Sequence, residues 1–234
     1  MNNLHHIFHK TITIATVFGY DLMHHFSCKE NSAQAEINQA FFEYTLQQFQ
    51  SSEQLEMMQQ ILEVEQEKFS LRNTHSAQIE TKLLSEYATF NHDRENLLHL
   101  SLEGLKNVTL QQSSYVTCYA TDWKFVFINE TDNTELLDKI QEFPKDEYYF
   151  VFQQTDVFDD VLQTNVLEFH LTKYEYYVLQ LFQETTSVKE VLNDFFEVFE
   201  IESEAQMHSL LKEATRIIKF LIYRKFIVRS NILR

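Results

Sequence analysis

Apolar residues recur at helical spacing through the first half of the chain. The clearest helix is predicted over residues 53–72, where most apolar side chains fall on one face against a surface of Glu and Gln. Ser52 is its candidate N-cap. A second amphipathic helix is predicted around residues 37–49, in a window rich in good helix formers. Two helices of this kind can pack against each other in antiparallel fashion.

Helical spacing continues beyond this pair. Further turns are predicted over residues 79–87 and, after the capping candidates Asn91 and Asp93, over residues 97–105. The pattern therefore predicts a helical bundle for residues 1–110.

The spacing becomes typical of strands after residue 110. Residues 113–129 (SSYVTCYATDWKFVFIN) hold two short runs of β-branched and aromatic residues, separated where Thr121 and Asp122 favour a turn. Residues 146–154 (DEYYFVFQQ) and 165–171 (NVLEFHL) predict two more strands. Together these segments predict a small antiparallel sheet.

The last third of the chain predicts three helices and a final strand. Thr172 with Glu175, and Ser187 with Glu190, have the spacing of capping boxes, and Ser203 marks a third helix start. A β-rich tail, FIVRS, follows the third helix. This order predicts a winged-helix-like module attached to the sheet.

The fold class predicted from these patterns is α+β. Residues 1–110 are expected to form a helical domain. Residues 111–234 are expected to form a domain with a β-sheet and a winged-helix-like part, which binds a peptide or a partner protein.

Composition and charge narrow the function. The chain has 234 residues but only two Gly and one Pro, so the glycine-rich phosphate loops and nucleophile elbows of many enzymes are absent. The formal net charge of −16 disfavours nonspecific binding to nucleic acid, which depends on Lys and Arg contacts with phosphates. No signal peptide or membrane span is predicted, and a soluble cytoplasmic protein is expected.

No residue pattern predicts catalysis or a metal site. Histidines gather near the N-terminus, where His5 and His9 share a helix face, but no HExxH motif accompanies them, and a solvated surface is the better interpretation. His170 and Glu168 share one face of a predicted strand, where a surface pair is expected rather than an acid/base pair. The two cysteines lie far apart in no CxxC pattern, so reduced thiols are expected.

The central sheet is the predicted binding element, because an extended peptide can add to a sheet edge as a further strand. Its aromatic strands supply the candidate contacts. The predicted peptide-binding residues are Trp123, Phe125, Phe127, Tyr148, Tyr149, Phe150, Val151 and Phe152.

The chain also resembles a known family in the order of its elements, in the helix LEVEQEKFSL and in the run L-x-x-x-E-x-x-x-L that begins at Leu171. It is similar to the MbnC-type partner proteins of methanobactin biosynthesis, which are encoded beside DUF692-type iron enzymes. The resemblance implies a non-catalytic subunit that forms a heterodimer with a TIM-barrel iron oxygenase. It also implies binding of the leader of a precursor peptide whose cysteines become oxazolone and thioamide groups in a copper chelator. The iron belongs to the partner enzyme, and no cofactor is expected in this chain.

Two alternatives stay open. The chain's main concentration of basic residues lies in its last predicted helix and the segment after it, which is compatible with a winged-helix DNA-binding regulator. A metalloenzyme that uses histidines of the N-terminal half is the other alternative.

Overall fold

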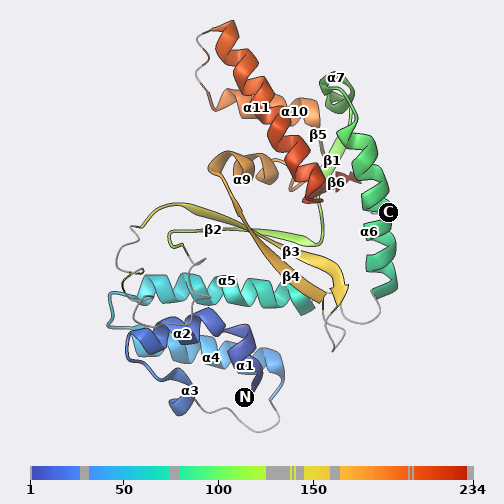
Figure 1. Ribbon diagram of the computed structural model, residues 1–234. Coiled ribbons are helices and arrows are strands. Elements are labelled where there is room, and N and C mark those ends of the chain that lie inside the picture. The colour runs from blue at the N-terminus through green and yellow to red at the C-terminus, as the bar shows by residue number, and fades with distance from the viewer. Residues whose placement is uncertain are drawn as a thin grey trace. The chain divides into compact units, whose positions relative to one another are not determined.

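The computed structural model describes residues 2–26, 32–73, 80–124, 138, 140, 145–158, 164–199, 201 and 203–230. These residues form ten helices and two three-stranded antiparallel sheets, which confirms the α+β class (Figure 1). The chain divides into two compact units. The first comprises residues 1–70 and 120–148, and the second comprises residues 71–119 and 149–234.

The first unit is mainly helical. Its helices are α1 (Asn2–Ile7), α2 (His9–Val17), α3 (Leu22–His25), α4 (Gln34–Phe49) and α5 (Leu55–Asn73), the last of which continues into the second unit. The helices predicted over 37–49 and 53–72 are confirmed as α4 and α5. Helix α5 begins three residues after Ser52, whose hydroxyl accepts a hydrogen bond from the Gln54 amide.

Aromatic packing joins the helices of the first unit. The ring of Phe41 on α4 lies 5.0 Å from Phe8, which precedes α2, and 5.2 Å from Phe26, which follows α3. Tyr20 packs against Phe49 at 4.2 Å. Phe8, Phe26, Phe41 and Phe49 are all buried, so ring contacts supply much of this core.

The second unit begins with one long helix rather than two. Helix α6 (Glu80–Leu98) runs through Asn91 and Asp93, so their prediction as caps of a new helix is wrong; α7 (Leu102–Lys106) follows and is capped by Ser101. Both residues bond to the C-terminal part of the chain instead. Asn91 accepts a hydrogen bond from Lys225, and Asp93 lies 3.4 Å from Arg229. These tertiary contacts explain why the polar residues Asn91 and Asp93 lie inside α6 and not at its start.

The predicted central sheet is confirmed in the order β2-β3-β4, from β2 (Val116–Thr121), β3 (Tyr148–Phe158) and β4 (Thr164–Leu171). Strands β3 and β4 are antiparallel, and Val151 lies opposite Phe169. Strand β2 ends at Thr121, and a bend follows at the position where the turn was expected. The expected strand through Phe125 and Phe127 lies outside the described residues.

A second sheet joins β1 (Thr109–Gln112), β5 (Thr186–Ser187) and β6 (Ile227–Arg229) in the order β5-β1-β6. The tail strand β6 was predicted, whereas β1 and the two-residue β5 were not. Helices α9 (Lys173–Gln180), α10 (Val188–Glu197) and α11 (Glu204–Tyr223) accompany this sheet. The two capping boxes, Thr172 with Glu175 and Ser187 with Glu190, are confirmed, as is the Ser203 cap.

The core of the second unit lies among these elements. Buried side chains from α9, α10, α11 and both sheets form one apolar cluster, with Phe182, Phe195 and Phe226 among its largest members. Each of the two compact units is built from two separate stretches of the chain. These units do not coincide with the predicted domains 1–110 and 111–234, and the division into those two domains stays a prediction. No helix in the described ranges combines the length and apolar character needed to cross a membrane.

Candidate functional site

The structure places most of the predicted peptide-binding strand in the interior. Phe150, Val151 and Phe152 are buried, and β3 is the middle strand of its sheet. Tyr149 is half-buried against Tyr176, with ring centres 4.7 Å apart. These side chains support the sheet, and the strands that end the sheet order in the described part of the chain are β2 and β4. Peptide contact by β3 stays a prediction.

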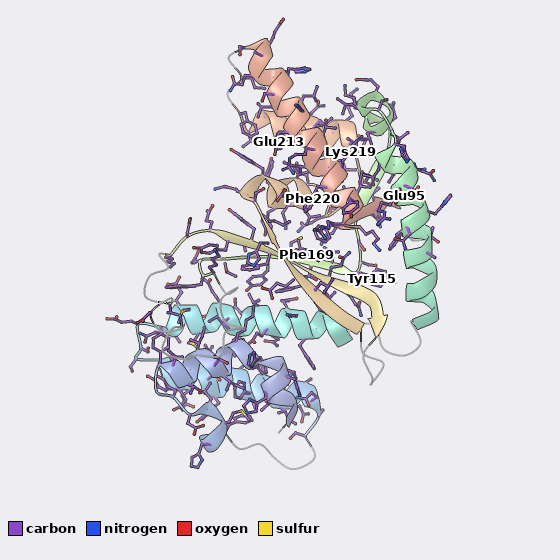
Figure 2. The ribbon with its side chains drawn as sticks, in the orientation of Figure 1. Glu95, Tyr115, Phe169, Glu213, Lys219 and Phe220 are labelled. Carbon is purple, nitrogen blue, oxygen red and sulfur yellow. The ribbon has the colours of Figure 1, made fainter. Side chains whose placement is uncertain are left out.

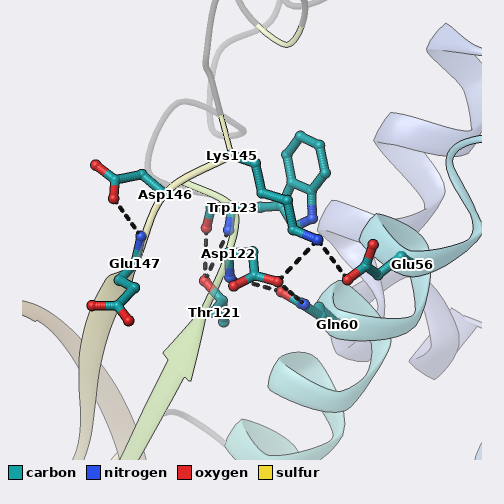
Figure 3. A network of polar contacts seen from close by, with 8 residues as sticks. All are labelled: Glu56, Gln60, Thr121, Asp122, Trp123, Lys145, Asp146 and Glu147. Atoms are coloured by element: carbon teal, nitrogen blue, oxygen red, sulfur yellow. Dashed lines mark hydrogen bonds and ion pairs between the residues drawn. The ribbon is translucent and has the colours of Figure 1, made fainter.

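Trp123, another predicted contact, belongs to a polar network in the first unit (Figure 3). Gln60 on α5 donates to the Asp122 carboxylate at 3.0 Å and accepts from the Asp122 amide at 2.9 Å. Lys145 lies between Glu56 at 2.7 Å and Asp122 at 3.4 Å. The Thr121 hydroxyl donates to the carbonyl of Trp123. The network therefore fastens the end of β2 to α5, which is a structural role.

The basic residues near the C-terminus are engaged within the second unit. Lys219, which Figure 2 labels, donates hydrogen bonds to the carbonyls of Leu98, the last residue of α6, and of Leu100, at 3.1 and 3.2 Å. Such bonds satisfy carbonyls that a helix end leaves without partners. Arg216 pairs with Glu213 and Glu175.

Arg224 and Arg229 are engaged in the same way. The Arg224 guanidinium lies 5.0 Å from the centre of the Phe169 ring and 5.7 Å from that of Phe220, both of which Figure 2 labels. Arg229 pairs with Asp93 on α6. These contacts link α6, α11 and β4, while the side chains of Arg216 and Arg224 remain exposed to solvent.

Cys118 is the cysteine that the structure describes, and it is free. Burial raises the pKa of the Cys118 thiol to about 12, so it stays protonated at neutral pH. Cys28 lies outside the described residues. His170 lies against the Phe150 ring at 4.6 Å. Within the described ranges, no group of three or more His, Cys, Asp or Glu side chains is placed to hold a metal ion.

The first unit has open hollows around Gly19, Tyr20, Asp21 and Leu22. One has a volume of about 220 Å³ and another about 410 Å³. Gly19 has a φ of 84°, a conformation that glycine adopts without strain. The Asp21 carboxylate accepts from the His24 amide at 2.9 Å and thereby caps α3. This carboxylate is therefore used by the fold.

Exposed apolar side chains are concentrated in the helices of the second unit. Val198 is 57% exposed, Tyr174 47% and Met207 38%. Burial of such large apolar side chains away from water would be favourable, so their exposure needs an explanation. Met207 lines a groove of about 480 Å³ where α10 gives way to α11. We call it the α10–α11 groove, and its lining residues are Ile201, Ser203, Glu204, Met207, His208 and Leu211.

A ridge of aromatic rings stands beside the start of this groove. Tyr174 on α9 lies 5.5 Å from Phe199 and 6.2 Å from Phe195, and Phe199 lies 5.0 Å from Phe195. Phe195 is buried, whereas Phe199 is half-buried and lies two positions before Ile201 of the groove. The ridge rests on the buried Phe195, and it is next to the groove along the chain through Phe199 and Ile201; together the ridge and the groove are the candidate apolar surface.

The sequence did not reveal this surface as a site. Its residues lie at ordinary core spacing in α10 and α11, and only the packing shows which apolar positions stay outside. A weak signal was present, because the short segment between the two helices keeps Val198, Phe199 and Ile201 where a connection is normally polar.

Comparison with protein-family models, curated proteins and solved structures finds no match for this chain. The candidate site therefore rests on the geometry described above.

Proposed function

We propose that this chain works by binding another protein, through the apolar surface that the α10–α11 groove and the Tyr174 ridge form in the second unit. The observation that carries the proposal is the solvent exposure of Tyr174, Val198 and Met207 on neighbouring helices. Contiguous apolar surface of this kind is typical of protein–protein contact sites, where aromatic and methionine side chains are enriched.

The specific form of the proposal comes from the resemblance to MbnC-type partners. In this form the chain is the non-catalytic subunit of a heterodimer with a DUF692-type iron oxygenase, and it binds the leader of a precursor peptide. Iron is then held by the partner enzyme. A leader added as a strand would pair with β2 or β4, because β3 has a neighbour on each side.

The DNA-binding alternative has one observation in its favour. Three helices with the small sheet β5-β1-β6 follow the order expected of a winged-helix module. Against it, Arg216, Lys219, Arg224 and Arg229 are engaged in contacts within the unit. Phosphate binding needs basic side chains that are available to release counterions, so protein binding is the better supported function.

Co-expression tests the proposal. The chain is produced with a DUF692-type enzyme from the same genome and purified through a tag on this chain, and co-elution and iron content are measured. We expect a stable complex that holds iron, and loss of the complex in the double variant Tyr174→Ser, Val198→Ser. Tyr223→Ser is the control, because Tyr223 is 55% exposed but lies at the other end of α11 from the groove residues.

Two outcomes would contradict the proposal. One is a complex that survives the double variant, or one that the Tyr223→Ser control disrupts to the same extent. The other is the absence of any complex, together with duplex DNA binding at low salt that weakens steeply as salt is added.

A further inference from the structure

The charge around the α10–α11 groove points to the chemistry of its occupant, and this inference rests on the proposed function. Between residues 191 and 211 the sequence has five acidic residues and no Lys or Arg. Of these acids, Asp194, Glu197 and Glu204 are described and exposed, and Glu204 lines the groove itself. Lys212, which is also exposed, directly follows Leu211, so five acidic residues and one basic residue lie between residues 191 and 212.

We propose that the α10–α11 groove binds a basic amphipathic segment of another protein. Apolar side chains of that segment enter the groove against Met207 and Leu211, and its Lys or Arg side chains meet Asp194, Glu197 and Glu204. Complementary charge of this kind speeds association and rejects acidic segments. Anchors at helical spacing that enter an apolar groove are a common mode of peptide recognition.

A second copy of this chain is a poor occupant. The chain has a formal net charge of −16, so two copies repel each other. Its own basic concentration near the C-terminus supplies Arg216, Lys219 and Arg229 to contacts inside the second unit. The occupant is therefore expected to come from a different protein.

Peptide binding to the full-length chain tests the inference directly. The probe is a labelled amphipathic peptide of leucine and lysine at helical spacing, and the comparison is the same peptide with glutamate in place of lysine. Fluorescence anisotropy measures both affinities. We expect the lysine peptide to bind at least about tenfold more tightly, and its affinity to fall as salt rises from ~50 mM to ~300 mM.

Two charge variants separate the groove from the net charge of the molecule. Asp194→Asn, Glu197→Gln, Glu204→Gln removes three of the five acidic charges between residues 191 and 211. Glu36→Gln, Glu43→Gln, Glu53→Gln removes the same number of exposed charges from the first unit. We expect the first triple variant to weaken lysine-peptide binding about tenfold and the second to leave it nearly unchanged. Met207→Ser is expected to weaken binding of the lysine peptide at every salt concentration.

The outcomes distinguish this inference from the proposed function. Equal effects of the two triple variants, or no effect of Met207→Ser, would overturn the groove as the site of basic recognition. Failure of the lysine peptide to bind would do the same. Either result leaves the co-purification experiment to decide separately whether the chain binds a partner protein through its apolar surface.

Discussion

The two units use a carboxylate at a helix start in opposite ways. In the first unit, Glu65 on α5 accepts from the amides of Lys10 and Thr11 at the start of α2, at 2.6 and 3.0 Å. In the second unit, Glu190 is part of the capping box of its own helix and bonds to Ser187. Glu65 is more than fifty residues away in sequence from the helix start that it caps, whereas Glu190 is three residues from Ser187.

Their surroundings give the two carboxylates different pKa values. Burial raises the pKa of Glu65 to about 7, even though backbone amides of Thr11 and Lys10 act in the other direction. Hydrogen bonds from Ser187 lower the pKa of Glu190, which lies near solvent. The surface cap therefore favours the charged carboxylate, whereas the interior cap favours the neutral carboxyl group.

The largest expected effect is on the remote cap. Glu65→Ala removes the acceptor of two buried amides, and we expect the first unit to lose about 3 kcal/mol of unfolding free energy. Trp123 is the only tryptophan of the chain and lies in the first unit, so urea unfolding followed by its fluorescence reports on this unit. A loss below about 1 kcal/mol would make the remote cap no stronger than a local one.

Glu65 also predicts a pH dependence. The pKa of the free side chain is 4.5, and in the folded protein it is about 7. Between these values the unfolded chain releases a proton that the folded chain keeps, so stability falls as pH rises from 4.5 to about 7. The full loss corresponds to about 3 kcal/mol.

The neutral variant Glu65→Gln isolates this contribution. Its first unit is expected to lose less stability than the wild type between pH 5 and pH 7, because no proton is released at position 65. Urea midpoints from Trp123 fluorescence at several pH values give the difference between the two proteins, in which other titrating groups largely cancel. Parallel curves for the two proteins would show that Glu65 does not titrate in this range.

Local patterns made much of the fold predictable. Thr172, Ser187 and Ser203 stand directly before their helices, and their partners lie three residues later, so the three starts are visible in the sequence. The strand patterns of residues 146–154 and 165–171 likewise predicted β3 and β4, which pair antiparallel. These features depend on neighbours in the chain, which a sequence displays.

Features that depend on remote partners were missed. Asn91 and Asp93 have the composition of caps, but Lys225 and Arg229 bond to them inside α6. Strand β1 is short and polar, with only Leu110 fully buried, and it forms because β5 and β6 lie on either side. The candidate site was missed for the same reason, its dependence on remote partners. Tertiary packing sets the exposure of Met207 and Val198, and the spacing of apolar residues alone does not determine it.

A smaller effect is expected at a local cap of the second unit. Thr172→Ala removes the acceptor of the Glu175 amide, and we expect a loss of about 1 kcal/mol. Hydrogen exchange measured by mass spectrometry should show faster exchange in the first turn of α9, with α2 unchanged. Thr172→Ser keeps the hydroxyl and is expected to retain most of the protection. Equal exchange in Thr172→Ala and the wild type would contradict a role for this cap.

The smallest effect is expected at Lys145, the cation of the network that Figure 3 shows. Its ion pairs with Glu56 and Asp122 are exposed, so water and salt screen them and two long side chains must be ordered to form them. Lys145→Met should therefore leave the urea midpoint from Trp123 fluorescence nearly unchanged, most clearly at high salt. Gln60→Ala is the comparison, because it removes both hydrogen bonds to Asp122 and should lower that midpoint. If Lys145→Met lowered the midpoint more than Gln60→Ala, the ion pairs and not the amide contacts would fasten β2 to α5.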